Sequence, residues 1–245
     1  MTKPIFILIT FFLTTGQLLA CGGAYQCRLF PIGTTNDKLV IIETSLNRYW
    51  GADTAGVTIE TRNRWKGVIT LKTMDKQGQL ETLQLIDTVD ILDRDYSKEL
   101  KAFFDTAFSI SSKLTDFQPA DIPTIEFCNF KEECEIIDLI SSTADTLTTK
   151  TKDEKEFKIS FPQTVIQESE TSGGMTNQTF KINSIRTIII GRHKLIVANF
   201  ASGEEHNTDF TTQTKDLQPC ESIADCVYKE VTLYHGLSFD AIIWN

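Results

Sequence analysis

Six cysteines stand in three pairs of equal spacing, and no other feature constrains the fold of this 245-residue chain as strongly. Each pair has five residues between its two thiols, and the pairs are Cys21 and Cys27, Cys128 and Cys134, and Cys220 and Cys226. In an exported protein an even number of cysteines indicates disulfides, and local pairing is the simplest connectivity. A loop of this size restrains the unfolded chain by only about 2–3 kcal/mol. The spacing therefore predicts three disulfides, each of which fixes a local turn.

A zinc site is the alternative use of the same cysteines, and the spacing disfavours it. Structural zinc sites usually place about two to four residues between paired thiolates. The histidines, His193, His206 and His235, show no paired spacing with the cysteines. We therefore expect neither a metal nor another cofactor.

The first twenty residues predict a secretory signal peptide. Lys3 is followed by an apolar run over residues 5–13 and then by Thr14, Thr15 and Gly16, which is the order of regions in such peptides. The run is shorter than the roughly 20 apolar residues that span a bilayer. We expect residues 1–20 to be removed and residues 21–245 to form a single extracytoplasmic domain. Its location would be periplasmic, envelope-associated or secreted.

The cleavage site has two interpretations. Residues 18–21 (LLAC) resemble the lipobox of bacterial lipoproteins, and that resemblance implies a diacylglyceryl group on Cys21 and a lipid anchor in a bacterial membrane. Ordinary signal-peptidase cleavage after Gly16 or Ala20 is the alternative. The equal cysteine spacing favours a Cys21–Cys27 disulfide over the lipid, because a lipidated Cys21 would leave Cys27 without its partner.

Periodicity predicts strands and hairpins together with one substantial helix. Residues 38–46 are rich in β-branched side chains and predict a strand. Residues 68–73 and 80–86 flank the turn at 75–78, which predicts a hairpin with Gly78 at a positive φ. Over residues 95–114 apolar side chains recur at steps of three and four. This spacing predicts an amphipathic helix with Asp93 or Asp95 as its cap.

The second half of the chain is predicted to be mostly β. A shorter helix is predicted over residues 131–140, and the polar residues 141–156 predict an exposed linker. Further strands are predicted over residues 157–161, 180–184, 186–190, 194–200, 226–234 and 237–244, with turns at 191–193 and 235–236. The alternation of strand and helix that a doubly wound sheet requires is missing. We expect one disulfide-stapled α+β domain of mostly antiparallel strands.

Net charge argues against nucleic acid as a partner. The chain carries 24 Lys+Arg against 33 Asp+Glu, a formal charge of −9. A grip on phosphate backbones needs a basic face, which this acidic balance does not favour. We expect the partner to be an unidentified envelope or extracellular ligand or protein. Contact with a membrane is expected only through a lipid on Cys21.

One cluster of basic and aromatic residues is a candidate ligand-binding site. Trp50, Arg62, Arg64 and Trp65 flank a short segment over residues 57–61. Tryptophan faces and arginine forks commonly serve carbohydrate, anion or protein recognition. The alternative is that the tryptophans fill the core and the arginines balance nearby acids.

No catalytic motif is evident in the sequence. Phosphate-binding loops, dinucleotide fingerprints, nucleophile elbows and zinc-protease motifs are all absent from it. We therefore expect an exported, non-catalytic protein with a binding or structural role. The alternative is an exported hydrolase that acts through carboxylates such as Asp87 or Asp93, because two carboxylates suffice for acid and base chemistry.

Overall fold

Runs of β-branched and alternating residues form long strands in the computed structural model of this chain. The structure describes residues 24–49, 64–92, 95–121, 124–126, 136–142, 146–151, 155–160, 180–202 and 237–244. The strands in these ranges are β1 (Ala24–Thr35), β2 (Lys38–Tyr49), β3 (Arg64–Met74), β4 (Leu80–Leu92), β5 (Gln118–Pro119), β6 (Thr124–Glu126), β7 (Ile136–Ser142), β8 (Thr146–Thr151), β9 (Glu156–Ser160), β10 (Phe180–Ile190), β11 (His193–Ser202) and β12 (Leu237–Trp244). The helix in these ranges is α1 (Tyr96–Ser111).

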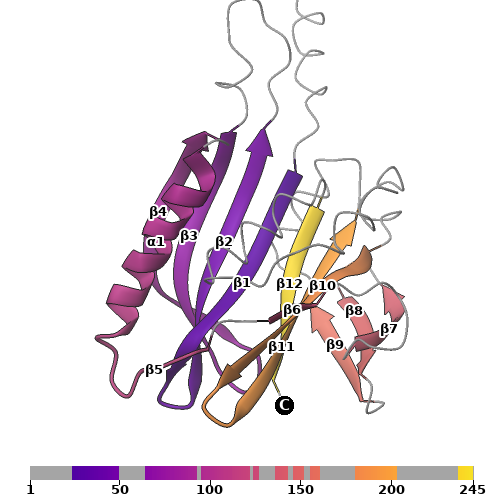
Figure 1. The fold of residues 1–245 in the computed structure, drawn as a ribbon. Helices are drawn as coiled ribbons and strands as arrows, with labels where there is room; N and C mark the ends of the chain where they lie inside the picture. The colour runs from indigo at the N-terminus through magenta and orange to yellow at the C-terminus, as the bar shows by residue number, and fades with distance from the viewer. Residues whose placement is uncertain are drawn as a thin grey trace, which may run out of the picture.

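Most of the described strands belong to one curled sheet of nine strands (Figure 1). Its order is β4-β3-β2-β1-β12-β11-β10-β6, and β5 pairs with β1 outside this path. β1 and β12 are parallel, whereas the other pairs in the described sheet are antiparallel. The β1–β2, β3–β4 and β10–β11 turns and the last residue of β12 therefore lie at the same end of the sheet. We call it the turn end.

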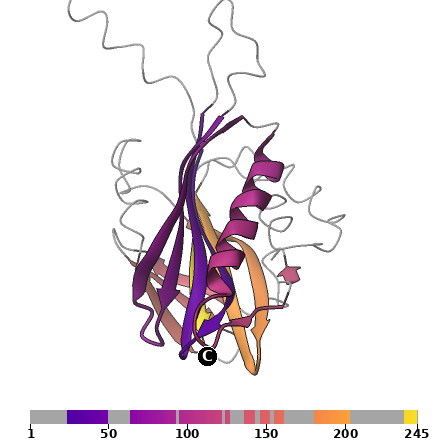
Figure 2. The same cartoon turned by 90° about the vertical axis from the view of Figure 1, so that its left-hand side faces the viewer.

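The helix α1 covers one face of β1–β4 (Figure 2). Its buried apolar side chains recur at steps of three and four residues, and they are Tyr96, Leu100, Phe104 and Ala107. Phe104 meets Phe30 of β1 edge-to-face, with 5.4 Å between the ring centroids. The predicted helix is confirmed, although it ends at Ser111. It begins directly after Asp95, whose side chain makes no capping hydrogen bond.

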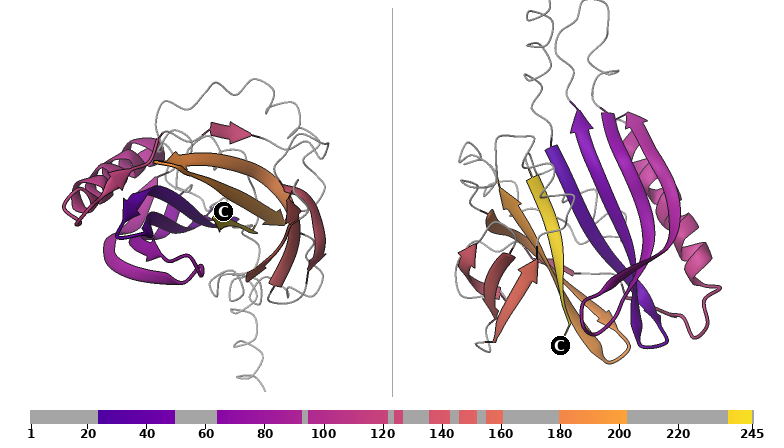
Figure 3. Two further views of the ribbon diagram at one scale, coloured as in Figure 1. Left: turned by 90° about the horizontal axis from the view of Figure 1, so that it is seen from below. Right: turned by 180° about the vertical axis from the view of Figure 1, so that it is seen from behind.

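A smaller sheet of β7, β8 and β9 packs near β10–β12 (Figure 3). Leu147 of β8 is buried in one cluster with Phe180 and Phe239, and Phe157 and Ile159 of β9 pack against that cluster. This sheet replaces two elements that the sequence predicts differently. Residues 136–140 form a strand where a helix is predicted, and β8 runs through the predicted linker at 141–156.

Both differences have the same physical cause. A short apolar run such as residues 136–140 fits a helix or a strand by periodicity alone, and hydrogen bonding to β8 decides for the strand. The threonine-rich β8 is polar, but threonine is β-branched and fits a paired strand. Leu147 and Thr149 alternate onto its buried side. Residues 131–135 lie outside the described part of the chain.

The strand predicted at residues 38–46 and the hairpin predicted at residues 68–86 are confirmed. Residues 38–46 fall in β2, and residues 68–73 and 80–86 fall in β3 and β4, with Gly78 at a φ of 80°. The strands predicted at 180–184 and 186–190 form the single strand β10, which has a register shift between Ile182 and Ser184. The strand predicted at 226–234 and the turn at 235–236 lie outside the described residues.

A third apolar cluster joins side chains of β1, β2 and β3 to those of β10 and β11. Its buried members are Leu29, Leu39, Ile41, Met74, Ile188, Ile190, Leu195 and Val197. The parallel pairing of β1 with β12 extends only from Tyr25 to Cys27, so the two halves of the sheet part beyond it. The described fold is mostly antiparallel β with one helix, which is compatible with the α+β class. No helix in the described ranges is long and apolar enough to cross a membrane.

Candidate functional site

Two tight hairpin turns lie at the turn end. The β1–β2 hairpin closes through Asn36 and Asp37, whose φ angles of 46° and 62° fit a type I′ turn. The β10–β11 hairpin closes through Gly191 and Arg192, and the φ of 59° at Gly191 fits a type II′ turn. Both turn types match the twist of paired strands, so the strands hold the residues at the two tips in place.

The β3–β4 turn presents Lys76 at the same end. The Asp75 carboxylate accepts hydrogen bonds from the N–H groups of Gln77 and Gln79, each at 2.9 Å. The N–H of Gly78 donates to the carbonyl of Asp75 at 3.0 Å. This network fixes the turn, and the exposed Lys76 stands next to the residue that organises it.

The segment after α1 closes another side of this region. Asp116 has a φ of 56°, a left-handed conformation that aspartate adopts more readily than most residues. Gly33 allows β5 to approach β1, because a Cβ at this position would lie 2.3 Å from the carbonyl oxygen of Gln118. The N–H of Ala120 donates to the carbonyl of Ile32 at 2.9 Å, and the next N–H donates to a β10 carbonyl at 3.1 Å. The segment therefore joins β1 to β10.

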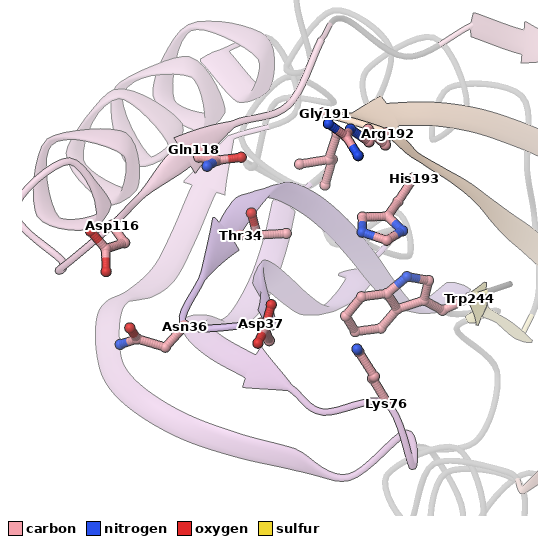
Figure 4. A pocket seen from close by; sticks show the side chains of 11 residues that line it. Thr34, Asn36, Asp37, Lys76, Asp116, Gln118, Gly191, Arg192, His193 and Trp244 are labelled. Carbon is pink, nitrogen blue, oxygen red and sulfur yellow. The ribbon is translucent and has the colours of Figure 1, made fainter.

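These turns and segments enclose a pocket of about 580 Å³ (Figure 4). The lining residues are Thr34, Asn36, Asp37, Lys76, Asp116, Gln118, Ile190, Gly191, Arg192, His193 and Trp244. We call it the turn-end pocket. In this view the two cationic side chains and the two aromatic rings stand on one side, Asn36 and Asp116 stand on the other, and Asp37 lies between them.

Trp244 supplies the aromatic surface of the turn-end pocket. Its half-buried ring packs against the third apolar cluster and meets His193 edge-to-face, with 6.0 Å between the centroids. Most other lining side chains are polar, and the cations Lys76 and Arg192 are matched by two carboxylates. The volume lies within the roughly 300–1,000 Å³ of small-molecule sites, but the lining is more polar than is usual for them. This chemistry suits a polar ligand with one apolar face.

A second polar cluster lies inside the sheet. Its members are Arg28, Arg186, Asn199 and Asp240, each at most 3% exposed, and we call them the Asp240 cluster. Arg28 Nε lies 3.0 Å from Asp240 Oδ1, and Asn199 Nδ2 donates to the same oxygen at 2.9 Å. Arg186 Nη2 donates to Asp240 Oδ2. Burial lowers the pKa of Arg186 to about 10, against the opposing charge of Asp240, so the guanidinium stays protonated at neutral pH.

The Asp240 cluster binds the backbone of β1 just beyond the point at which the β1–β12 ladder ends. The ladder ends at Cys27 and Phe239, and Leu29 lies two residues further along β1. The N–H of Leu29 donates to Asp240 Oδ2 at 2.9 Å, and its carbonyl accepts from Arg186 Nη2 at 3.0 Å. Side chains of β12 and β10 thus satisfy the backbone of β1. The cluster is buried, so its role is to join the halves of the sheet.

Arg64 and Trp65, the two residues of the predicted basic and aromatic site that the structure describes, do not line the turn-end pocket. Trp65 is 1% exposed and stacks on Tyr96 of α1 at 4.6 Å between centroids, so it occupies the core. Arg64 is partly exposed and pairs with Asp90 at 2.8 Å. Trp50 and Arg62 lie outside the described residues. The described half of the predicted site therefore has a packing role and a surface ion pair.

The carboxylates predicted for a hydrolase do not form a site within the described residues. Asp87 is exposed on β4, and its Oδ1 accepts the N–H of Thr88 at 2.7 Å. It does not line the turn-end pocket. Asp93 lies outside the described residues. Among the residues that the structure describes, no three His, Cys, Asp or Glu side chains are placed to hold a metal ion.

Cys27 is the cysteine that falls within the described residues. It is a free thiol, 2% exposed, and Ser45 Oγ donates to its Sγ at 3.8 Å. Burial, assisted by the nearby Glu43, raises the pKa of this thiol to about 12. No disulfide is present in the described part of the chain. The other cysteines lie outside it, and they are Cys21, Cys128, Cys134, Cys220 and Cys226.

The described geometry defines a mostly antiparallel β protein with a polar pocket at one end of a curled sheet. No protein-family model, curated protein or solved structure matches the chain.

Most residues of the turn-end pocket carry little signal in the sequence. The turn segments at 33–37, 75–78 and 191–193 are each recognisable, and successive turns of a meander alternate between its ends. The β1–β2 and β3–β4 turns could therefore have been placed together. Trp244 and Arg192 join them only through the parallel pairing of β1 with β12, which links residues more than 200 positions apart.

Proposed function

We propose that this chain is an exported, non-catalytic binding protein whose ligand occupies the turn-end pocket. The observation that carries the proposal is the meeting of Trp244 with polar side chains from three hairpin turns and the segment after α1. Hairpin turns held by their strands keep such side chains close to their binding positions before the ligand arrives, which lowers the entropy cost of binding.

The direction of β1 supports binding at an envelope surface. Ala24 lies at one end of this strand, only three residues after Cys21, and Thr34 of the turn-end pocket lies at the other. Twelve residues of strand extend about 36–40 Å. A lipid on Cys21 would therefore leave the pocket open on the side away from the membrane, and a secreted form would leave it open as well.

The hydrolase alternative is favoured by one observation. Asp37 and Asp116 line the same pocket, and two carboxylates are sufficient for acid and base chemistry. Both side chains are exposed, whereas the acid of such a pair usually lies in an apolar, desolvated environment. Exposure of both carboxylates favours the binding role.

Amide NMR tests the location of the binding site. The ¹⁵N-labelled mature chain is titrated with oligosaccharides, amino acids and dicarboxylates, each up to about 10 mM. We expect at least one class to shift the amides of Asp37, Lys76, Gly191 and Arg192 without shifting those of α1, because the ligand touches only the turn end. Shifts confined to other parts of the chain, or no shift with any class, would refute a binding site in this pocket.

Cysteine chemistry is the second part of the proposal. The pairs Cys128–Cys134 and Cys220–Cys226 close as local disulfides, while Cys27 stays a buried thiol. In the folded chain Cys27 is a free thiol that is 2% exposed, so it is poorly accessible to another sulfur. This burial supports lipidation as the fate of Cys21.

Intact mass and alkylation together test the cysteine assignment. We expect the mature protein to carry a diacylglyceryl mass and to resist iodoacetamide in its folded state at pH 8. Denaturation without reductant should then expose one reactive thiol. The folded pKa of Cys27 lies above the usual 9.0, so protection should be complete below pH 9 and should fade as the pH approaches about 12. A lipid-free mass with no thiol after denaturation would instead establish the Cys21–Cys27 disulfide.

A further inference from the structure

We propose that the turn-end pocket binds an uncharged oligosaccharide, an inference that rests on the proposed binding function and names its ligand class. Three observations point to this class: a single tryptophan face, a lining that both donates and accepts hydrogen bonds, and a balance of charge.

Trp244 provides the surface on which a sugar ring stacks. A pyranose has one face of C–H groups, which are apolar, and a rim of hydroxyls, which are polar. The indole is a rigid amphipathic plate, and burying part of it against the C–H face needs little ordering of the side chain. Trp244 is held in advance by the third apolar cluster and by its edge-to-face contact with His193.

The lining around Trp244 matches the hydrogen bonding of hydroxyl groups. A hydroxyl both donates and accepts, so it requires partners of both kinds. Lys76 and Arg192 are donors, Asp37 and Asp116 are acceptors, and the amide of Gln118 supplies one of each. A lining of this kind satisfies several hydroxyls at once, whereas an apolar ligand would leave these polar groups facing it unpaired.

Charge balance separates an uncharged ligand from an anion. The cations Lys76 and Arg192 face an equal number of carboxylates, with histidine counted as neutral. An anion would gain from the cations but would meet Asp37, which lies between the two sides of the pocket in Figure 4. The volume of about 580 Å³ is also larger than a single amino acid fills, which disfavours a small zwitterion.

Titration with charged and uncharged probes tests the ligand class. The mature protein is titrated with maltotriose, cellotriose and triacetylchitotriose, with a trimer of galacturonic acid, and with free amino acids, while tryptophan fluorescence and amide shifts are followed. We expect one of the uncharged trisaccharides to shift the turn-end amides. Its affinity should change less than about twofold between roughly 50 mM and 0.5 M salt, because screening acts only on charges.

Variants of lining residues separate stacking from charge attraction. Trp244→Ala should weaken binding of the trisaccharide at least about tenfold, and Trp244→Tyr should restore most of it, because a ring suffices. Gln118→Ala, a change of an exposed side chain, should weaken binding about threefold or more and covers the case in which Trp244→Ala fails to fold. Lys76→Gln removes a charge but keeps a hydrogen-bond donor in the lining, so it should weaken binding less than Gln118→Ala does. The control Lys101→Gln on α1, away from the pocket, should leave the affinity unchanged.

The possible negative results separate the ligand class from the binding function. If only the galacturonic acid trimer or an amino acid shifts the turn-end amides, the uncharged oligosaccharide is wrong while the pocket remains a binding site. A tenfold loss of affinity with Lys76→Gln would also show that charge attraction, rather than stacking, dominates binding. If no probe of any class shifts those amides, the proposed binding function itself fails.

Discussion

Replacing Asp240 by asparagine is expected to lower the free energy of unfolding by about 3–5 kcal/mol. Each carboxylate oxygen of Asp240 faces two donor groups, and the donors belong to Arg28, Asn199, Arg186 and the Leu29 backbone. Asparagine has the same shape, but its NH₂ group would face donors, and two buried guanidinium groups would lose their shared carboxylate. Breaking one side of a buried ion pair is costly because the remaining charge stays away from water.

Thermal and denaturant melts of the mature protein measure this effect. A loss of this size corresponds to a fall in melting temperature of roughly 6–20 °C for a chain of this length. Asp90→Asn is the matched control, because Asp90 pairs with Arg64 at 2.8 Å on the surface, where both side chains are about half exposed. We expect the control to cost less than about 1 kcal/mol. Equal losses in the two variants would mean that the Asp240 cluster does not join the sheet halves as described.

Replacing Trp65 by alanine is the second large effect, with an expected loss of about 3–5 kcal/mol. The ring is 1% exposed, and it stacks on Tyr96, so it ties β3 to α1. Alanine would leave a cavity between the sheet and the helix, and the neighbouring side chains could refill only part of it.

The same substitution separates the two interpretations of the predicted basic and aromatic site. We expect Trp65→Ala to unfold at markedly lower denaturant, whereas the exposed Leu85→Ala on β4 should change stability by about 0.5 kcal/mol or less. Urea unfolding followed by circular dichroism gives both values. A fully stable Trp65→Ala protein would contradict the packing role and would return Trp65 to the list of ligand-binding candidates.

Elements with a local signal were predictable from the sequence. The helix α1 shows its three- and four-residue period within its own length, and the β3–β4 hairpin shows its turn through Asp75 and Gly78. Such patterns act over a few residues, so no knowledge of the rest of the chain is needed. The β8 strand shows the limit, because its threonines fit a strand only once β7 and β9 are beside it.

The candidate site was much less predictable. The sequence drew attention to Trp65 because it stands among basic residues, yet the structure buries it against Tyr96. No sequence pattern marked Trp244 or Lys76 as a site residue, because Trp244 ends a strand and Lys76 lies in an ordinary turn. Nothing near either residue indicates that they line one pocket.

The sequence by itself determined the predominance of strands, the one long helix in the described ranges and the positions of the turns, because propensity and period are local properties. Tertiary structure alone decided how these pieces meet. The backbone of Leu29 is completed by Asp240, which is 211 residues away, and the turn-end pocket joins Thr34 to Trp244. Such contacts depend on the free energy of packing and hydrogen bonding over the whole sheet, and no short stretch of sequence contains it.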